Sequence, residues 1–170
     1  MVKPAIEKII WCYGIYQEIF DKYAHVQFHE GLPDLAIFDG KQKTLLILDD
    51  LMSETDERVT KLFTKISHHM NVSILYLTQN LFYSGKHSRT ISLNAHYFVL
   101  FKNVRDSTQV SILARQMFPG KANFMIEAFQ DATMAPFGYL LVDLRSETDE
   151  RCRIRSNIFP GETHYVYVRK

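Results

Sequence analysis

Cysteine is scarce in this chain, which has only Cys12 and Cys152 among its 170 residues. Two cysteines are too few for a disulfide framework or a four-cysteine zinc site, so the sequence predicts a protein of a reducing compartment. The first residues lack the apolar segment of a signal peptide, and no apolar run approaches the roughly 18 residues that cross a membrane. We therefore expect an intracellular protein without membrane contact.

An excess of charge of either sign is missing as well. Lysine and arginine together number 20 against 19 aspartates and glutamates, which gives a net charge of +1. This balance excludes a protein that coats nucleic acid by bulk positive charge, although it leaves room for a local basic strip. Hydrophobic residues make up 46% of the chain, enough for a packed core, and the length suits a single domain over residues 1–170.

Five short apolar runs predict buried strands. Each is hydrophobic almost without interruption, which is typical of strands covered on both faces of a parallel sheet. The runs are residues 9–13, 44–48, 72–77, 97–101 and 139–142. The C-terminal tail differs, because residues 152–158 and 164–169 resemble edge strands of an antiparallel hairpin joined by Pro160 and Gly161.

Apolar residues at helical spacing lie between these runs. One stripe predicts a helix of roughly residues 56–69, and it consists of Val59, Leu62, Phe63 and Ile66. A similar stripe follows Gly14, with Ile15, Ile19, Phe20 and Tyr23. A capping-box pattern at 106–109 starts a further helix that stops at Pro119. Strands alternating with helices predict an α/β fold with a mostly parallel sheet flanked by helices.

Two adjacent acids, Asp49 and Asp50, follow the apolar run at residues 44–48. Open α/β sheets bind ligands at the carboxyl ends of their strands, and buried carboxylates need a cation or hydrogen bonds to balance them. A hydrophobic strand ending in two acids is the Walker B arrangement of nucleotide hydrolases. There the first acid holds Mg²⁺ and the second polarises the attacking water. The same pattern also occurs at ordinary solvent-exposed strand ends.

Polar side chains also follow the next apolar run, where Leu77 is succeeded by Thr78, Gln79 and Asn80. Side chains at the end of a neighbouring strand can reach a γ-phosphate or its attacking water, provided that the catalytic parts converge in space. Gln79 and Asn80 are therefore candidate nucleotide-contacting residues. The alternative for Asn80 is a simple asparagine-containing turn.

Two arginines are candidates for a phosphate-binding role. Arg89 lies in a polar loop, and Arg105 follows the run at residues 97–101. An arginine in such a position can enter the phosphate site of a neighbouring subunit. It can equally be solvated or pair with a nearby acid, as Arg105 can with Asp106.

Three further arginines, Arg151, Arg153 and Arg155, alternate along the predicted edge strand. Alternation places all three on one face of that strand. Such a strip is suited to contacting a phosphate backbone, although charged residues on edge strands also prevent aggregation.

The order of these parts resembles that of the DNA-packaging ATPases of large DNA viruses and of Maverick and Polinton elements. These proteins belong to the FtsK–HerA class of P-loop NTPases. The resemblance covers roughly residues 8–160. It rests on four stretches in order, which are Leu45–Asp50, Ser67–Phe82, Arg89–Tyr97 and Phe101–Asp106.

The resemblance implies a role for each matched position. Asp49 corresponds to the Mg²⁺-associated Walker B acid, Asp50 to the catalytic acid and Gln79 to the polar sensor. Arg105, or alternatively Arg89, corresponds to the arginine finger that acts across a subunit ring. The family further implies ATP and Mg²⁺ as cofactors, double-stranded DNA as the translocated partner, self-association into a hexameric ring, and capsid proteins as partners at an intracellular site of virion assembly, in the host nucleus or cytoplasm.

One part of the family pattern is missing. No Gly-x-x-x-x-Gly-Lys-[Ser/Thr] loop occurs in the chain, and Gly85-Lys86 and Gly120-Lys121 both lack the upstream glycine. Family members carry this Walker A strand, loop and helix before the segment equivalent to residues 9–13. Because the loop supplies most of the phosphate cradle, this chain alone is not expected to hydrolyse ATP.

Two interpretations follow from the missing loop. The favoured one is that the chain is the C-terminal portion of a longer ATPase, with a P-loop NTPase-like sheet that is incomplete at its N-terminus. The alternative is a non-catalytic binding or assembly module derived from such an ATPase.

Overall fold

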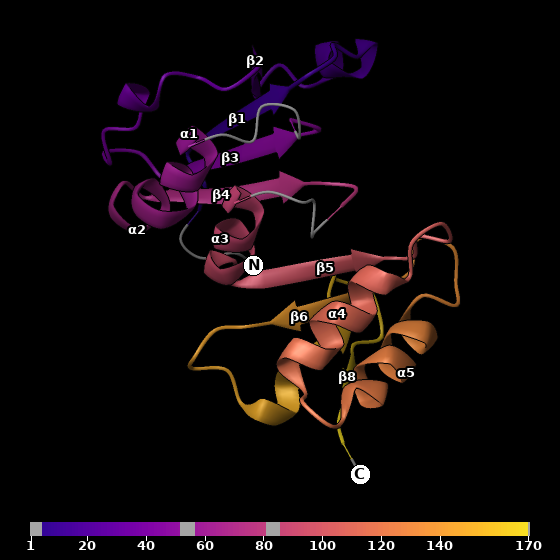
Figure 1. The fold of residues 1–170 in the computed structure, drawn as a ribbon. Helices are drawn as coiled ribbons and strands as arrows, with labels where there is room; N and C mark the ends of the chain where they lie inside the picture. Colours follow the sequence, from indigo (N-terminus) through magenta and orange to yellow (C-terminus); the bar gives the residue numbers. More distant parts are fainter. Residues whose placement is uncertain (1–4, 52–56, 81–85, 170) are drawn as a thin grey trace. The chain divides into compact units, whose positions relative to one another are not determined.

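The computed structural model describes residues 5–51, 57–80 and 86–169, without the side chains of residues 86–88. Two compact units make up the chain, Met1–Asn94 and Ala95–Lys170, where the length predicts a single domain. The division follows from strand pairing, because each unit builds a four-stranded sheet of its own (Figure 1).

The first unit is built on a parallel sheet with the strand order β2-β1-β3-β4. The strands are β1 (Lys8–Tyr13), β2 (Gln27–Glu30), β3 (Thr44–Asp49) and β4 (Val72–Leu77). β3 pairs with β1 on one side and with β4 on the other, so that Tyr13, Asp49 and Leu77 are register partners at the carboxyl ends. The predicted strands at 9–13, 44–48 and 72–77 are thus confirmed, and so is their parallel pairing.

Helical segments pack against one face of this sheet. α1 (Glu57–Lys61), the π-helical segment η4 (Leu62–Ile66) and α2 (Ser67–His69) follow one another without a break, which confirms the predicted helix over its described residues. The core lies between these segments, α3 (Lys86–Asn94) and the strands. Its fully or nearly fully buried members include Ile10, Cys12, Leu46, Leu48, Val59 and Leu62.

The helix predicted after Gly14 is wrong. Residues Glu18–Lys22 form only a short 3-10 helix, η1, and Ile15 at the start of the predicted stripe is 80% exposed. Phe20 alone of that stripe is buried, because its ring packs on the sheet face opposite α1. Its ring partners are Trp11 and Tyr13 of β1, Phe28 of β2, and Tyr16. A second 3-10 turn, η2 (Leu35–Ile37), lies between β2 and β3.

The second unit has an antiparallel sheet with the strand order β5-β6-β7-β8. Its strands are β5 (Tyr97–Phe101), β6 (Tyr139–Asp143), β7 (Ile154–Ser156) and β8 (Tyr165–Tyr167). α4 (Thr108–Met117) and α5 (Ala122–Ala132) connect β5 to β6, and the 3-10 helix η5 (Glu150–Cys152) precedes β7. None of the helices in the described ranges is long and apolar enough to cross a membrane.

The strands predicted at 97–101 and 139–142 form, but their assignment to the parallel sheet is wrong. β5 and β6 pair with each other and run antiparallel. A continuous hydrophobic run carries no information on strand direction, and in β5 it does not correspond to burial on both faces either, because alternate residues are exposed. β6 is buried along its whole length because it has a strand on each side and α5 against it.

Two other predictions in this unit are confirmed. The C-terminal hairpin forms from β7 and β8, although β7 also pairs with β6, so that of these two strands β8 alone lies at an edge of the sheet. The helix predicted after residue 106 forms as α4, although not through a capping box, because its N-cap is Ser107 and makes no side-chain cap hydrogen bond. The Asp106 carboxylate instead accepts hydrogen bonds from the Thr108 backbone N–H and the Gln109 side chain. Accepting bonds from the first turn of a helix satisfies backbone donors that would otherwise lack partners.

A buried ion-pair network fixes the end of β6. Asp143 has no exposed surface, and its carboxylate accepts hydrogen bonds from Arg145 and from Arg155, the latter at 2.7 Å. Arg153 donates to the backbone carbonyls of Asp143 and Arg145. Burial alone would raise the pKa of Asp143, but the hydrogen bonds from Arg145, the nearby Thr148 hydroxyl and the charge of Arg145 together outweigh it and hold that pKa below its ordinary value.

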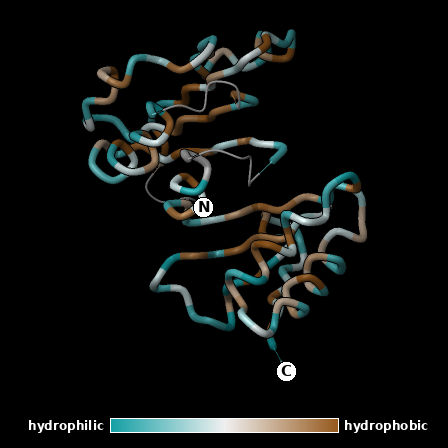
Figure 2. The backbone as a smooth tube through the Cα atoms, in the orientation of Figure 1, coloured by the Kyte–Doolittle hydropathy of each residue, from teal (hydrophilic) through white to brown (hydrophobic). Residues whose placement is uncertain are grey.

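The edge strands β4 and β5 both carry exposed apolar side chains. In β4, Leu75 and Leu77 are 43% and 38% exposed, whereas Val72 is buried toward the helices. In β5, Val99 and Phe101 are 46% and 60% exposed. Figure 2 shows hydrophobic stretches running along the strands of both units. Each unit thus presents one sheet edge with apolar side chains on it.

A pair of leucine truncations tests which face of the parallel sheet is packed. Leu46 is fully buried, so Leu46→Ala should lower the free energy of unfolding by about 3 kcal/mol, because it leaves a cavity in the core. Leu75→Ala removes the same atoms from an exposed position and should cost less than about 1 kcal/mol. Urea unfolding followed by the fluorescence of Trp11, the single tryptophan, measures both. Equal losses would contradict the assignment of the helix-covered face.

The Asp143 network should make the second unit sensitive to acid. A carboxyl with a lowered folded-state pKa contributes stability above its unfolded pKa of about 4, and that stability is lost as the pH falls through the folded value. Asp143→Asn should abolish this dependence and destabilise the unit by about 3–5 kcal/mol at pH 7, because the largely buried Arg155 loses its charged partner and Arg145 keeps only Glu147.

Circular dichroism during urea unfolding at pH 7 and pH 3 measures both effects of the Asp143 substitution. The control is Asp149→Asn, which removes an acid paired with Arg151 at 3.0 Å on the surface, where both side chains are at least half exposed. Exposed pairs contribute little to stability. A loss as large for Asp149→Asn as for Asp143→Asn would refute the role of the buried network.

Candidate functional site

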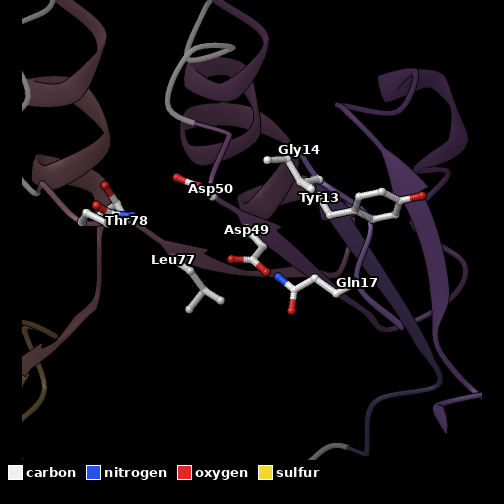
Figure 3. A pocket seen from close by; sticks show the side chains of 9 residues that line it. Tyr13, Gly14, Gln17, Asp49, Asp50, Leu77 and Thr78 are labelled. Carbon is white, nitrogen blue, oxygen red and sulfur yellow. The ribbon is translucent and has the colours of Figure 1, made fainter. Parts of the chain in front are cut away.

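A pocket of about 430 Å³ lies at the carboxyl ends of β1, β3 and β4 (Figure 3). The lining comes from the residues that end or follow these three strands. It consists of Tyr13, Gly14, Ile15, Gln17, Asp49, Asp50, Leu77, Thr78 and Gln79. The structure therefore brings together the two acids and the glutamine that the sequence places at the ends of separate strands.

Asp49 is the last residue of β3 and is half-buried. Its carboxylate Oδ2 accepts a hydrogen bond from the indole Nε1–H of Trp11 in β1, at 3.2 Å. Figure 3 shows the side chain pointing into the space lined by Leu77 and Gln17. The first acid of the pair is thus held by a protein donor at one oxygen while it lines the pocket.

Asp50 is exposed and has a left-handed backbone conformation, with φ of 53°. This conformation is unfavourable for most residues other than glycine, although aspartate adopts it more readily than most. It turns the chain sharply at the end of β3. Gly14 lies beside this turn, since a Cβ atom added to Gly14 would come within 3.3 Å of the Asp50 carbonyl oxygen.

The polar residues after β4 separate into two groups. Thr78 and Gln79 line the pocket, with Thr78 half-buried and Gln79 exposed. The Thr78 hydroxyl also donates to the Asn80 carbonyl and accepts from the Asn80 backbone N–H. Asn80 stands in this turn and is not one of the residues that line the pocket, in agreement with the turn that the sequence offered as its alternative.

The two candidate arginine fingers lie outside the pocket lining. Arg89 is an exposed residue of α3 in the first unit. Arg105 is exposed on the loop after β5, in the second unit, and its backbone N–H donates to the Asn103 side chain. Which of the two arginines acts as an arginine finger therefore stays a prediction.

The predicted strip of three arginines does not form as a strip. β7 covers only Ile154–Ser156, and each arginine pairs with an acid instead. Arg151 pairs with Asp149, Arg153 with Glu150 and Arg155 with Asp143. Arg153 and Arg155 have side chains only 16% and 22% exposed, so both are largely withdrawn from any ligand.

Several residues that line the pocket are not identified as site residues by the sequence alone. Tyr13, Gly14 and Gln17 line the pocket because β1 pairs with β3 in a register that places Tyr13 opposite Asp49. Trp11 reaches Asp49 for the same reason, across 38 positions of sequence. The only available signal is the apolar run at 9–13, which predicts a neighbouring parallel strand and therefore a shared edge.

The pocket chemistry suits a hard cation better than an anion. None of its described lining residues is basic, and two are carboxylates, which repel a phosphate unless a cation bridges them. Carboxylate, hydroxyl and amide oxygens are the ligand types that Mg²⁺ accepts, and one or two carboxylates suffice when substrate phosphates and water complete the shell. Within the described ranges no cluster of three or more His, Cys, Asp or Glu forms a complete metal cage.

No protein-family model, curated protein or solved structure matches this chain. The fold that is shown is a mixed α/β arrangement, with a four-stranded parallel sheet in one unit and an antiparallel sheet in the other.

The backbone at Asp50 yields a matched test of strain. Replacing Asp50 by glycine should relieve the left-handed conformation, whereas alanine must adopt it without the help of a polar side chain. Asp50→Gly should therefore be more stable than Asp50→Ala by about 1 kcal/mol. Urea unfolding followed by Trp11 fluorescence compares the two. An alanine variant as stable as the glycine variant would show that this turn is not under strain.

Proposed function

We propose that this chain is the C-terminal portion of a ring-forming, DNA-translocating ATPase of the FtsK–HerA class. The observation that carries the proposal is the convergence of Asp49, Asp50 and Gln79 on one pocket at the carboxyl edge of a parallel sheet. The sequence places these residues on two strands, and those strands are direct neighbours in register. Ligand sites of open α/β sheets occupy such an edge.

The three pocket residues have distinct roles in this proposal. Asp49, partly buried and oriented by Trp11, contacts Mg²⁺ directly or through water. Asp50, exposed at the turn, accepts a hydrogen bond from the attacking water and polarises it. Gln79 contacts that water or the γ-phosphate from the neighbouring strand. Mg²⁺ held by Asp49 would supply positive charge that offsets the charge developing on the transferred phosphate.

The phosphate-binding part must come from outside the described pocket. Its lining offers no positive charge, so a Walker A loop would have to supply the backbone donors and the lysine. The parallel sheet ends at β4 on this side, and Leu75 and Leu77 are exposed there. A further parallel strand leading into such a loop would pair with this edge and place the phosphates beside Asp49 and Gln79.

The proposal also includes the arginine finger, the ring and the partners that the resemblance implies. Arg105, or Arg89 as the alternative, acts as the arginine finger toward the next subunit of a hexameric ring. Both side chains are exposed, as an arginine must be to reach a neighbouring subunit. Double-stranded DNA is the translocated partner, and capsid proteins are partners at an intracellular site of packaging.

The decisive test begins with the coding sequence upstream of Met1. An in-frame Gly-x-x-x-x-Gly-Lys-[Ser/Thr] segment is expected there. The protein that includes it should hydrolyse ATP faster when double-stranded DNA is added, and Asp50→Asn should reduce that rate at least a hundredfold, because the attacking water loses the charged carboxylate that polarises it. A steady-state phosphate-release assay measures the rate.

The control for this experiment is Asp39→Asn, which removes an exposed acid of the same unit, paired with Lys41 at 3.3 Å and outside the pocket lining. It should leave the rate unchanged. Full activity of the Asp50→Asn protein would refute the role of Asp50. An extended protein that folds but does not hydrolyse ATP would refute the ATPase assignment as a whole.

A second candidate function is a non-catalytic binding or assembly module related to such an ATPase. The exposed apolar side chains on the edge strands β4 and β5 favour it, because strand edges of this kind pair with other chains. Co-purification of this chain with a full-length ATPase, unaffected by Asp49→Ala and weakened by Arg105→Ala, would support this function. Absence of any association would exclude it.

A further inference from the structure

We propose that Trp11 is a positioning residue for Asp49. Its indole N–H holds one carboxylate oxygen and so fixes the orientation in which the acid faces a divalent cation in the pocket. This inference rests on the proposed function, because it assumes that Asp49 contacts the cation.

The geometry follows from strand pairing. Trp11 in β1 is the register partner of Ile47 in β3, and Asp49 lies two residues further along. Side chains two positions apart on a strand point to the same face, so Trp11 and Asp49 share the face opposite the helices. The indole Nε1–H donates to Asp49 Oδ2 at 3.2 Å. The donor therefore reaches the acid diagonally across two adjacent strands.

The indole is itself held by other aromatic rings. Its centroid lies 5.9 Å from that of Phe20 and 6.0 Å from that of Phe28. Those two rings stack on each other at 4.5 Å, and Phe20 is 4% exposed. A donor fixed by packing loses little conformational entropy when it binds its acceptor, which is the property required of a group that orients a ligand.

The hydrogen bond between Trp11 and Asp49 differs from a structural ion pair because its donor carries no charge. A carboxylate has about four acceptor sites and the indole is a neutral donor that uses one of them, so Asp49 keeps its negative charge and most of its lone pairs. Asp143 in the second unit shows the opposite case, because Arg145 and Arg155 neutralise it in a buried network. Of these two acids, Asp49 is the one left able to attract a cation.

A purely structural role for the indole is the competing explanation. β1 and β3 already pair over six register positions, from Lys8 opposite Thr44 to Tyr13 opposite Asp49. The strands therefore need no side-chain link to hold their register. The effect of removing the donor should accordingly appear in cation binding and not in stability.

Mn²⁺ binding to the present chain tests the inference without any ATPase assay, since Mn²⁺ prefers the same oxygen ligands and is detected by electron paramagnetic resonance. Trp11→Phe keeps a ring among its aromatic neighbours and removes the N–H donor. It should weaken Mn²⁺ binding about tenfold, the usual scale for loss of a second-layer hydrogen bond. In the native chain, Mn²⁺ should quench Trp11 fluorescence with the same midpoint.

Two further variants make the outcomes distinguishable. Asp49→Asn should abolish binding, and Asp39→Asn, which removes an exposed acid outside the pocket lining, should bind Mn²⁺ within about twofold of the native chain. Native affinity in Trp11→Phe, with binding lost in Asp49→Asn, would overturn the role of Trp11 and leave the cation role of Asp49 intact. Native affinity in Asp49→Asn would overturn the cation role of Asp49 in the proposed function. No saturable binding by the native chain would overturn the present inference but not that role, because in the proposed function substrate phosphates complete the ligand shell.

Discussion

The candidate site depends on the pairing of β3 with a parallel strand on each side. β1 and β4 both match β3 over six positions, and this register places Tyr13, Asp49 and Leu77 in one row at the carboxyl edge. The loops that follow the three strands then begin at the same level and enclose the pocket. A shift of one residue in either pairing would turn every side chain of that strand to the other face. The convergence of Asp50, Gly14 and Gln79 is thus a property of the backbone.

The two units use a carboxylate at the end of a strand in opposite ways. Asp143 ends β6, is fully buried and is neutralised by arginines, so its charge stabilises the fold. Asp49 ends β3, is half-buried and accepts a hydrogen bond from a neutral indole, so its charge remains directed at the pocket. A carboxylate at a strand end therefore stabilises the fold in one sheet and faces a pocket in the other. The difference lies in its hydrogen-bond donor, which is charged for Asp143 and neutral for Asp49.

The sequence predicts local structure well and long-range structure poorly. The apolar runs locate β1, β3, β4, β5 and β6, and the stripe from Val59 locates the helical segment that covers the first sheet. Strand direction in the second unit is missed, because a hydrophobic run carries no information on direction. The stripe around Phe20 predicts a long helix, whereas the ring is held by aromatic neighbours on the sheet. The partners of Asp49 and of Arg155 lie on other strands and depend on register, which no local pattern reports.

The division into two units has a consequence for how the chain should lose its structure. Each unit has its own sheet and its own buried residues, so cooperativity within each is stronger than between them. The only tryptophan lies in the first unit, whereas the acid-sensitive carboxylate lies in the second. Moderate acid should therefore loosen the second unit while tryptophan emission still reports an intact first sheet, and amide hydrogen exchange would separate the chain into a slow half and a fast half.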